Sequence, residues 1–253
     1  RINTRHGMAN YPFSRKRELL YRFAMSFSDI GAVVCDKAKE NFLRYHIIPA
    51  AKAITVYNGI PVDRFQPRSS GARQRFLAET GWPDNSVLLG VVARLNPPKD
   101  HKMLLRAMAL VRQRAPQTRL VVIGNGPLRE ELESLSLELG LQDVVRFLGD
   151  RSDVQALLPG LDIFVLSSVT EGYSISLLEA CAAALPIVAT DVGGNREIVR
   201  DGTHGFLVPA RSPDEFSSAV LRLVCDPSLR SAMGKRNRQF AEEGGSVQAM
   251  AER

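Results

Sequence analysis

The chain of 253 residues is long enough for one or two domains with a sizeable core, and its 45% hydrophobic and 24% charged content is typical of a soluble protein. Its apolar runs are too short to cross a bilayer and no signal peptide is visible, so we expect a cytoplasmic protein without a transmembrane helix. The three cysteines (Cys35, Cys181 and Cys225) are far apart and lack the spacing of a metal site, so we expect reduced thiols.

The net charge of +6 belongs to the first quarter of the chain. Residues 1–60 carry 10 of the 33 basic and 4 of the 27 acidic side chains, and residues 61–253 carry 23 of each. Within residues 14–27 the bases stand beside apolar residues at helical spacing: Leu19, Leu20, Phe23 and Phe27. This pattern fits a basic amphipathic helix in peripheral contact with an anionic membrane, or the solvated face of a helix in a mildly basic domain. We expect no nucleic-acid partner, because no aromatic stacking platform or known binding motif accompanies the bases.

The first 60 residues alternate between strand and helix, which is typical of a parallel sheet. Residues 1–7 look like the end of a strand and its exit loop, and the absence of an initiator Met leads us to expect that upstream residues have been removed. After a basic helix, strands are predicted over 30–35 and 52–57, with Asp36 as the N-cap of a helix over 37–45.

A stretch rich in proline, glycine and serine marks a domain boundary near residue 61. A second α/β unit follows, with a short helix over 73–80 and Asp100 as the cap of the helix after the first strand. Its apolar runs predict six strands, over residues 87–93, 120–124, 144–149, 163–166, 186–190 and 205–209.

Polar or glycine-rich segments follow four of these strands. They are Arg94 to Lys99, Gly124-Asn125-Gly126, Glu171 to Glu179, and Gly193-Gly194. In a parallel sheet the strand exits lie on one edge, where ligands bind, so we expect the four loops to converge on one crevice. Taken singly, each segment also fits an ordinary surface loop or turn.

The charges in these loops suit a nucleotide-sugar. Arg94 and Lys99 would supply two positive charges for a diphosphate, since arginine clamps two phosphate oxygens and lysine acts as a point charge. The carboxylates of Glu171 and Glu179 can accept hydrogen bonds from sugar or ribose hydroxyls.

The segment between the two glutamates fits the same ligand. Gly172 lets the backbone approach a ligand closely, and Ser174 and Ser176 can cap a helix whose N-terminus favours an anion such as phosphate. Gly124-Asn125-Gly126 is not the G-x-G-x-x-G fingerprint, so dinucleotide binding has little support.

Six motifs follow one another along the second unit: A-R-L-N-P-P-K-D (93–100), V-I-G-N-G-P (122–127), V-R-F-L-G (145–149), E-G-Y-S-I-S-L-L-E (171–179), D-V-G-G-N-R-E-I-V (191–199) and H-G-F-L-V-P (204–209). In these motifs the chain resembles the family-four retaining glycosyltransferases of the GT-B fold (glycosyl transferases group 1). The motifs match in order across residues 87–210. T-R-H-G (4–7) and V-Y-N-G-I (56–60) resemble the end of the family's N-terminal domain.

The resemblance implies an α/β chain of GT-B type, with a Rossmann-like parallel sheet in the C-terminal domain and a partial N-terminal Rossmann-like domain. Residues 1–60 would be a remnant of the N-terminal, acceptor-side domain. Residues 61–235 would be the donor-binding domain, and residues 236–253 the start of a C-terminal crossover helix. We therefore expect a fragment, truncated at the N-terminus, that keeps the donor half-site and is itself inactive.

The resemblance also implies catalytic roles for four residues. Arg94 and Lys99 would hold the donor diphosphate and its leaving-group charge, His6 would project towards the donor sugar, and Glu171 would position that sugar. A covalent nucleophilic role for Glu171 is an alternative.

Further residues would bind the donor. Glu179 would contact the ribose, and the base would lie near Gly126 and residues 148–151. The complete implied set is Arg94, Lys99, Gly124, Asn125, Gly126, Leu148, Arg151, Gly172, Tyr173, Ser174, Ile175 and Glu179.

The expected reaction is transfer of a sugar from a UDP-, GDP- or ADP-sugar to a glycan or glycolipid acceptor, with retention at the anomeric carbon, in polysaccharide or lipopolysaccharide biosynthesis. No D-x-D motif occurs in the sequence, so neither a metal nor a cofactor beyond the donor substrate is implied. Two other functions fit the same donor chemistry, a GT-B nucleotide-sugar epimerase and a non-catalytic nucleotide-sugar-binding module.

Overall fold

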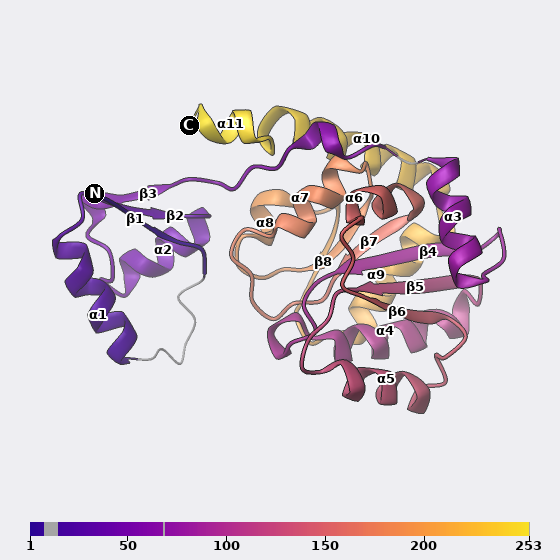
Figure 1. The fold of residues 1–253 in the computed structure, drawn as a ribbon. Coiled ribbons are helices and arrows are strands. Elements are labelled where there is room, and N and C mark those ends of the chain that lie inside the picture. The colour runs from indigo at the N-terminus through magenta and orange to yellow at the C-terminus, as the bar shows by residue number, and fades with distance from the viewer. Residues whose placement is uncertain (8–14, 68, 253) are drawn as a thin grey trace.

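The computed structural model describes residues 1–7, 15–67 and 69–252, and it contains two parallel sheets flanked by helices (Figure 1). The predicted α/β class with parallel sheets is confirmed. A smaller unit begins the chain, and a larger unit follows it. A connecting segment between Thr55 and Ser70 joins the two.

The described residues of the smaller unit form three strands, in the order β1-β2-β3, and two α-helices. Its elements are β1 (Ile2–Arg5), α1 (Arg15–Ser26), β2 (Ile30–Val33), α2 (Asp36–Arg44) and β3 (Ala53–Thr55). The central strand β2 is mostly buried because it pairs with both neighbours, Ala32 lying between Thr4 of β1 and Ile54 of β3.

The larger unit is built on six parallel strands in the order β6-β5-β4-β7-β8-β9. They are β4 (Val87–Val92), β5 (Thr118–Ile123), β6 (Val145–Gly149), β7 (Ile163–Leu166), β8 (Ile187–Thr190) and β9 (Gly205–Val208). The order runs outward in both directions from β4 and β7, so the switch point, where α/β sheets bind ligands, lies between these two strands.

Helices cover both faces of the larger sheet (Figure 1). They are α3 (Ser70–Thr80), α4 (His101–Arg114), α5 (Arg129–Glu138), α6 (Val154–Leu157), α7 (Ile175–Ala182), α8 (Asn195–Ile198), α9 (Pro213–Cys225), α10 (Pro227–Gly244) and α11 (Val247–Ala251). One hydrophobic cluster joins α4, α5 and α9 to the sheet, and a second joins α3, α7 and the smaller unit to its other face. Coverage of both faces explains why β7 and β8 are buried at every position.

Two predicted helix caps have different outcomes. Asp100 caps α4 as expected, with its carboxylate accepting a hydrogen bond from the Met103 N–H at 3.3 Å. Asp36 was wrongly predicted as the N-cap of α2: it is the first residue of that helix. Its carboxylate accepts instead from Thr55 Oγ1 (2.6 Å) and Tyr57 Oη (2.7 Å), because the exit of β3 brings two hydroxyls to it.

The end of the chain differs in detail from the expected division at residues 235 and 236. That position lies inside α10, which is continuous from Pro227 to Gly244. The helix axis is interrupted only at Gly245, after which Ser246 caps α11 through the Ala249 N–H at 3.0 Å.

The segment that joins the two units is held at this interruption. Ile60 N–H donates to Gly245 O (2.9 Å), and Val247 N–H donates to Ile60 O (3.1 Å). The connection between the units is therefore fixed to the end of α10. Within the described parts of the chain, no helix has both the length and the apolar character needed to cross a membrane.

Candidate functional site

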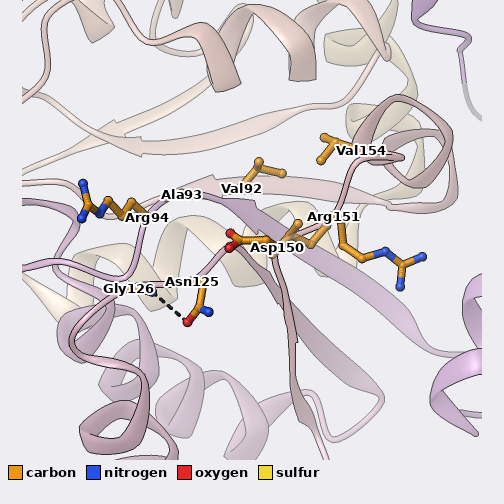
Figure 2. Close-up of a pocket in the computed structure, with 10 residues that line it drawn as sticks. Val92, Ala93, Arg94, Asn125, Gly126, Asp150, Arg151 and Val154 are labelled. Carbon is orange, nitrogen blue, oxygen red and sulfur yellow. Dashed lines mark hydrogen bonds between the residues drawn. The ribbon is translucent and has the colours of Figure 1, made fainter.

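A pocket of about 660 Å³ opens at the exits of three neighbouring strands, β6, β5 and β4 (Figure 2). We call it the exit pocket. It is lined by Val92, Ala93, Arg94, Ile123, Gly124, Asn125, Gly126, Asp150, Arg151 and Val154. Of the four loops that were expected to converge on one crevice, those after β4 and β5 line this pocket, because adjacent strands carry them.

The floor of the exit pocket is made by two interlocked loops. Leu95 N–H donates to Asn125 O at 2.9 Å, and Ala93 N–H donates to Ile123 O at 3.0 Å. A Cβ at Gly124 would overlap the Ala93 carbonyl oxygen, so only glycine lets the loops approach this closely. The glycine-rich turn after β5 is thus required by packing, and it leaves the backbone open to a ligand.

Arg94 and Asp150 are the exposed charges of the exit pocket, and neither side chain forms a hydrogen bond or ion pair with another described residue. In Figure 2 the Asp150 carboxylate points to the side on which Asn125 and Arg94 lie. Asp150 lies in the segment 148–151 that was expected near the base, but it was not named as a site residue, although it directly follows β6. The pocket therefore offers a cation for an anionic group and a carboxylate for hydroxyls or a base.

Two residues predicted to lie near the base are placed differently. Leu148 is not among the lining residues, because its side chain packs against the hydrophobic cluster shared with the smaller unit. Arg151 lines the pocket, but its guanidinium pairs with Asp153 (2.8 Å) and Glu79 (2.6 Å) and points away from Asn125 in Figure 2. The hydrogen bonds from Arg151 to Asp153 and Glu79 raise the pKa of the arginine and neutralise its charge locally.

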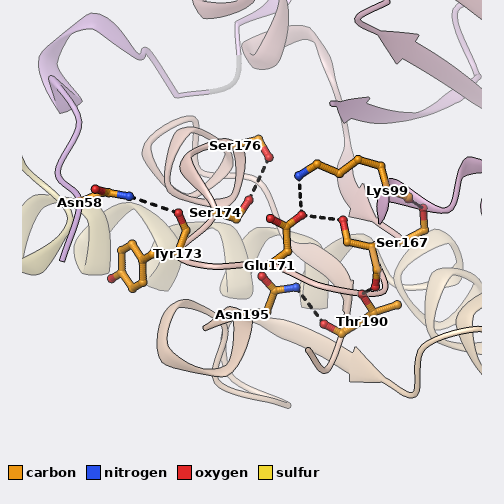
Figure 3. A network of polar contacts seen from close by, with 10 residues as sticks. Asn58, Lys99, Ser167, Glu171, Tyr173, Ser174, Ser176, Thr190 and Asn195 are labelled. Carbon is orange, nitrogen blue, oxygen red and sulfur yellow. Dashed lines mark hydrogen bonds and ion pairs between the residues drawn. The ribbon is translucent and has the colours of Figure 1, made fainter. Parts of the chain in front are cut away.

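A second polar cluster lies at the exits of β4 and β7, next to the exit pocket in the order of the sheet (Figure 3). We call it the Glu171 cluster; it consists of Lys99, Ser168 and Glu171. Lys99 Nζ lies 2.5 Å from Glu171 Oε1, and Ser168 Oγ donates to the same oxygen at 2.6 Å. Glu171 is buried, and a buried charge needs a partner. Lys99 balances the charge, and Glu171 Oε1 accepts two hydrogen bonds.

The loops that carry the cluster are tied to one another. Ser167 Oγ donates to Lys99 O (2.8 Å), and Val169 N–H donates to Pro98 O (2.8 Å). Beneath them, Thr190 Oγ1 donates to Ser168 O at 2.6 Å. These contacts join the exits of β4, β7 and β8 into one support.

The Gly193-Gly194 pair lies directly against the loop that holds Glu171. Gly194 N–H donates to Gly172 O at 2.9 Å. A Cβ at Gly193, whose φ is +54°, would overlap the Glu171 carbonyl oxygen. The two glycines thus allow the Glu171–Gly172 backbone to lie directly against the loop that follows β8.

Helix α7 starts at the rim of the Glu171 cluster, and its first turn is not capped by a side chain. Ser174 and Ser176 were expected to cap it, but their hydroxyls lie 3.1 Å from each other and neither caps the backbone. The first N–H groups of α7 are therefore available to an anion, which the helix dipole favours. Tyr173 is buried just before the helix and Ile175, its first residue, is exposed.

Glu179 follows one turn into α7. Its carboxyl is half-buried and forms no hydrogen bond or ion pair with any other described residue. Burial alone raises the pKa of Glu179 from its usual value to about 7. This carboxyl lies on the helix that follows β7 and has no partner in the described chain. It therefore suits a ligand that brings hydroxyl donors.

His6 is brought to the same place by the main chain. Its carbonyl oxygen would lie 2.6 Å from a Cβ added at Gly172, so the exit of β1 touches the loop after Glu171. The imidazole is exposed and has no hydrogen-bond partner within the described residues.

Comparison with known proteins shows the family to which the chain belongs. The sequence profile described as "Glycosyl transferases group 1" matches residues 72–240. The chain is 34% identical over 197 residues to the "Putative glycosyltransferase EpsD" of Bacillus subtilis (strain 168), covering 77% of this chain and 52% of that protein. It is 34% identical over 217 residues to the "D-inositol 3-phosphate glycosyltransferase" of Corynebacterium jeikeium (strain K411), covering 82% of this chain and 52% of that protein.

The fold is similar to that of solved GT-B glycosyltransferases. The crystal structure of Anabaena HepE in complex with UDP superposes with a TM-score of 0.91 at 22% identity, covering 99% of this chain and 70% of that chain. The chain spans about half the length of the curated relatives it matches. With a family profile over two thirds of its residues and a GT-B architecture, the chain belongs to the group 1 glycosyltransferases.

Proposed function

We propose that this chain carries the nucleotide-sugar site of a retaining, metal-independent glycosyltransferase that acts on a glycan or lipid-linked acceptor. The observation that carries the proposal is the position of the exit pocket beside the Glu171 cluster, at the switch point of the larger sheet. The pocket has room for a nucleoside, and the cluster carries the charges that a diphosphate and a sugar require. The HepE structure, which contains UDP, supports a nucleotide as the ligand.

Arg94 and the N-terminus of α7 would bind the diphosphate. Arg94 has no competing partner in the described structure, and its guanidinium can hold two phosphate oxygens at once. The uncapped N–H groups at the start of α7 provide a second, uncharged anion site. Glu179 would accept hydrogen bonds from the ribose hydroxyls, which bring the donors that its carboxyl lacks.

Lys99 and Glu171 would act at the transferred sugar. Glu171 Oε1 is held by Lys99 and Ser168, which favours a fixed, hydrogen-bonding carboxylate over a covalent nucleophile. As the bond to the leaving diphosphate breaks, positive charge develops on the sugar and negative charge on the leaving oxygen. Lys99 would stabilise the latter and Glu171 would orient the former, which is electrostatic catalysis by fixed charges.

We propose metal independence because Arg94 and Lys99 can supply the positive charge that a bridging ion would otherwise provide. Addition of EDTA to the binding assay below should then leave the dissociation constant unchanged. A loss of binding that Mg²⁺ or Mn²⁺ restores would contradict this part of the proposal.

Helix α1 supports a peripheral membrane contact, which would place the protein at the cytoplasmic inner face of a membrane. Its outward face carries exposed apolar side chains, Leu19 (68% exposed), Leu20 (68%) and Phe23 (65%), and Phe27 (59%) directly follows the helix. Glu18 and Met25, seven residues apart, are buried on the opposite side against the smaller sheet. Helix α1 thus has an exposed apolar stripe in the most basic part of the chain, which anionic lipid would match in both polarity and charge.

Vesicle co-sedimentation tests this contact. We expect binding to vesicles with a high fraction of anionic phospholipid and none to neutral vesicles, and Phe23→Ser with Phe27→Ser should abolish it. Absence of binding to the anionic vesicles would remove the membrane contact from the proposal.

Nucleotide binding is the direct test of the donor site. Titration calorimetry of the 253-residue chain against UDP, GDP, ADP and their sugar conjugates should give binding to one nucleotide. Glu179→Ala and Lys99→Ala should weaken that binding, whereas Glu138→Ala, an exposed residue of α5 that has no partner in the described chain, should not. If no nucleotide binds, or if the three variants behave alike, the donor site is assigned wrongly.

A further inference from the structure

Glu197, in α8 of the larger unit, forms hydrogen bonds to the smaller unit. Its carboxylate accepts a hydrogen bond from the Asp36 N–H at 2.8 Å and another from the Lys37 N–H at 2.9 Å, one on each oxygen. These are the first two residues of α2. A carboxylate from the larger unit therefore caps a helix of the smaller unit.

Cys35 occupies the N-cap position of α2, and its thiol lies near the backbone N–H groups of Lys37 and Ala38 without an assigned capping hydrogen bond. The neighbouring Asp36 carboxylate is occupied by Thr55 and Tyr57. Glu197 thus supplies two carboxylate acceptors and a negative charge at the positive end of the helix dipole.

The cap lies in a wider contact between the units, which we call the unit interface. Gly194 leaves no room for a side chain, since a Cβ there would lie 2.9 Å from Cys35 Cβ. The loop after Glu171 is covered in the same way by the exit of β2, because a Cβ at Gly172 would lie 3.3 Å from Val34 Cγ2. The exit of β2 therefore rests on both loops of the larger unit at once.

The exit of β3 adds contacts to the donor loop, residues 171–175. The rings of Tyr57 and Tyr173 lie 5.1 Å apart, and Asn58 Nδ2 approaches Tyr173 O at 3.4 Å (Figure 3). The Tyr57 hydroxyl donates to Asp36, so the aromatic contact and the start of α2 are joined. The donor loop is thus held between the smaller unit above it and the Gly193-Gly194 pair below it.

We propose that Glu197 is a positioning residue that latches the smaller unit onto the donor loop. It holds α2, and through it the exits of β2 and β3, against residues 171–175. Opening of the two units breaks its two hydrogen bonds and frees the donor loop from one side. The part played by the donor loop rests on the proposed function, whereas the latch itself does not.

Hydrogen exchange followed by mass spectrometry on the 253-residue chain tests the latch without any nucleotide. In Glu197→Ala we expect the amides of Asp36 and Lys37 to exchange about tenfold faster, because a lost cap exposes them to water. Peptides over residues 171–175 should also exchange faster. In Glu197→Gln the single carbonyl oxygen can retain one of the two bonds, so the exchange rate at the start of α2 should fall between those of the native chain and Glu197→Ala.

Two controls separate the latch from a general loss of stability. Glu138→Ala removes an equal charge from an exposed site and should leave exchange unchanged. Strand β5 is remote from the interface, and its amides should stay as protected in Glu197→Ala as in the native chain. Unchanged exchange at Asp36 and Lys37 would overturn the proposal, and so would faster exchange in β5 by the same factor.

Nucleotide binding then shows whether the latch serves the donor site. With the nucleotide that binds the native chain, Glu197→Ala should raise the dissociation constant several-fold, and Glu197→Gln should restore part of the affinity. If no nucleotide binds any variant, the proposed function fails while the exchange result at α2 still decides the latch. If a nucleotide binds the native chain and Glu197→Ala equally well, the link to the donor site is wrong.

Discussion

The exit pocket and the Glu171 cluster lie side by side on one sheet edge, yet they are built in opposite ways. The exit pocket is open, and its charged groups Arg94 and Asp150 have no partner in the described chain. The Glu171 cluster is buried, and its carboxylate is already paired with Lys99 and Ser168. An open pocket can adapt to the ligand that enters, whereas a paired and supported cluster keeps its geometry before any ligand arrives.

The difference has a physical origin in what lies beneath each region. The loops of the exit pocket are held by backbone hydrogen bonds and present their side chains to water. The loop that carries Glu171 contacts the smaller unit at Gly172 and is supported by Gly193 and Gly194, and Glu171 itself is buried, so an unpaired charge there would be costly. Changes to the cluster should therefore affect stability and binding together, and changes to the pocket should affect binding alone.

The largest effect is expected from Gly193→Ala, which removes the support of the cluster. The new Cβ would overlap the Glu171 carbonyl oxygen at a φ of +54°, so we expect the free energy of unfolding to fall by about 3 kcal/mol. Gly202→Ala is the matched control. It also has a positive φ, of +71°, but no neighbouring atom within 4 Å, and it should cost only about 1 kcal/mol. Equal losses in urea unfolding of the two variants would show that strain at φ alone, and not the close approach, matters at residue 193.

Lys99→Ala should lower stability and binding at the same time. It leaves the buried Glu171 carboxylate without its cation, at a cost of about 2–3 kcal/mol, and it should weaken nucleotide-sugar binding by about 100-fold.

The double variant Lys99→Met with Glu171→Gln separates these two effects. It removes both charges, so thermal unfolding should return close to the native value while calorimetry still shows weak binding. If binding returned together with stability, the pair would be structural and not part of the donor site.

Arg94→Ala should affect binding without affecting stability, because Arg94 has no partner to lose. We expect the dissociation constant of the nucleotide-sugar to rise by about 10- to 30-fold, as for loss of a charged hydrogen bond, with stability within about 0.5 kcal/mol. Arg114, an exposed arginine at the C-terminal end of α4, provides the control. Arg114→Ala should change neither the dissociation constant nor the stability. Loss of stability in Arg94→Ala would contradict the description of the exit pocket as open.

The smallest effect expected is a pH dependence from Glu179. Its pKa is raised to about 7, and the ionised form is the better acceptor for ribose hydroxyls, so affinity should rise about tenfold from pH 6 to pH 8. A nucleotide-sugar is the appropriate ligand, because its diphosphate diester has no proton that titrates near neutral pH. Glu179→Gln should bind with an affinity that does not change over this range.

The raised pKa of Glu179 has the opposite consequence for folding: the free energy of unfolding should decrease as the pH rises, whereas the affinity increases. The folded chain holds the Glu179 proton more tightly than the unfolded chain, so this group stabilises the fold at a pH below its usual pKa of 4.5. That contribution is lost as the pH rises through 7. A titration of thermal stability in which Glu179→Gln and the native chain have the same pH profile would contradict the raised pKa.

Much of the fold followed from local patterns. Each predicted strand of the larger unit is an apolar run of a few residues, and burial on both faces of a parallel sheet needs such runs. The polar segments after β4, β5, β7 and β8 were found because they directly follow those runs. Asp150 follows β6 in the same way and lies in the segment expected near the base, but it was not named because that segment was judged by resemblance and not by position.

Some side-chain pairings were not foreseen because the partners are distant in sequence. The segment 148–151 was expected near the base; Arg151 lines the exit pocket, but its guanidinium pairs with Glu79, 72 residues before it. Asp36 was expected to cap α2, but Thr55 and Tyr57 occupy its carboxylate. Ser174 and Ser176 bond to each other because their short spacing at the helix start allows it.

The sequence by itself determined the alternation of strands and helices, the strand exits that carry charge, and the family. These depend on hydrophobic periodicity and on motifs, which are local properties of the chain. Only the tertiary structure decided which charges are paired, as in Lys99 with Glu171, and which remain free, as in Arg94. It also placed Glu197 on a helix 160 residues earlier in the chain, because folding brings the exits of two separate sheets together.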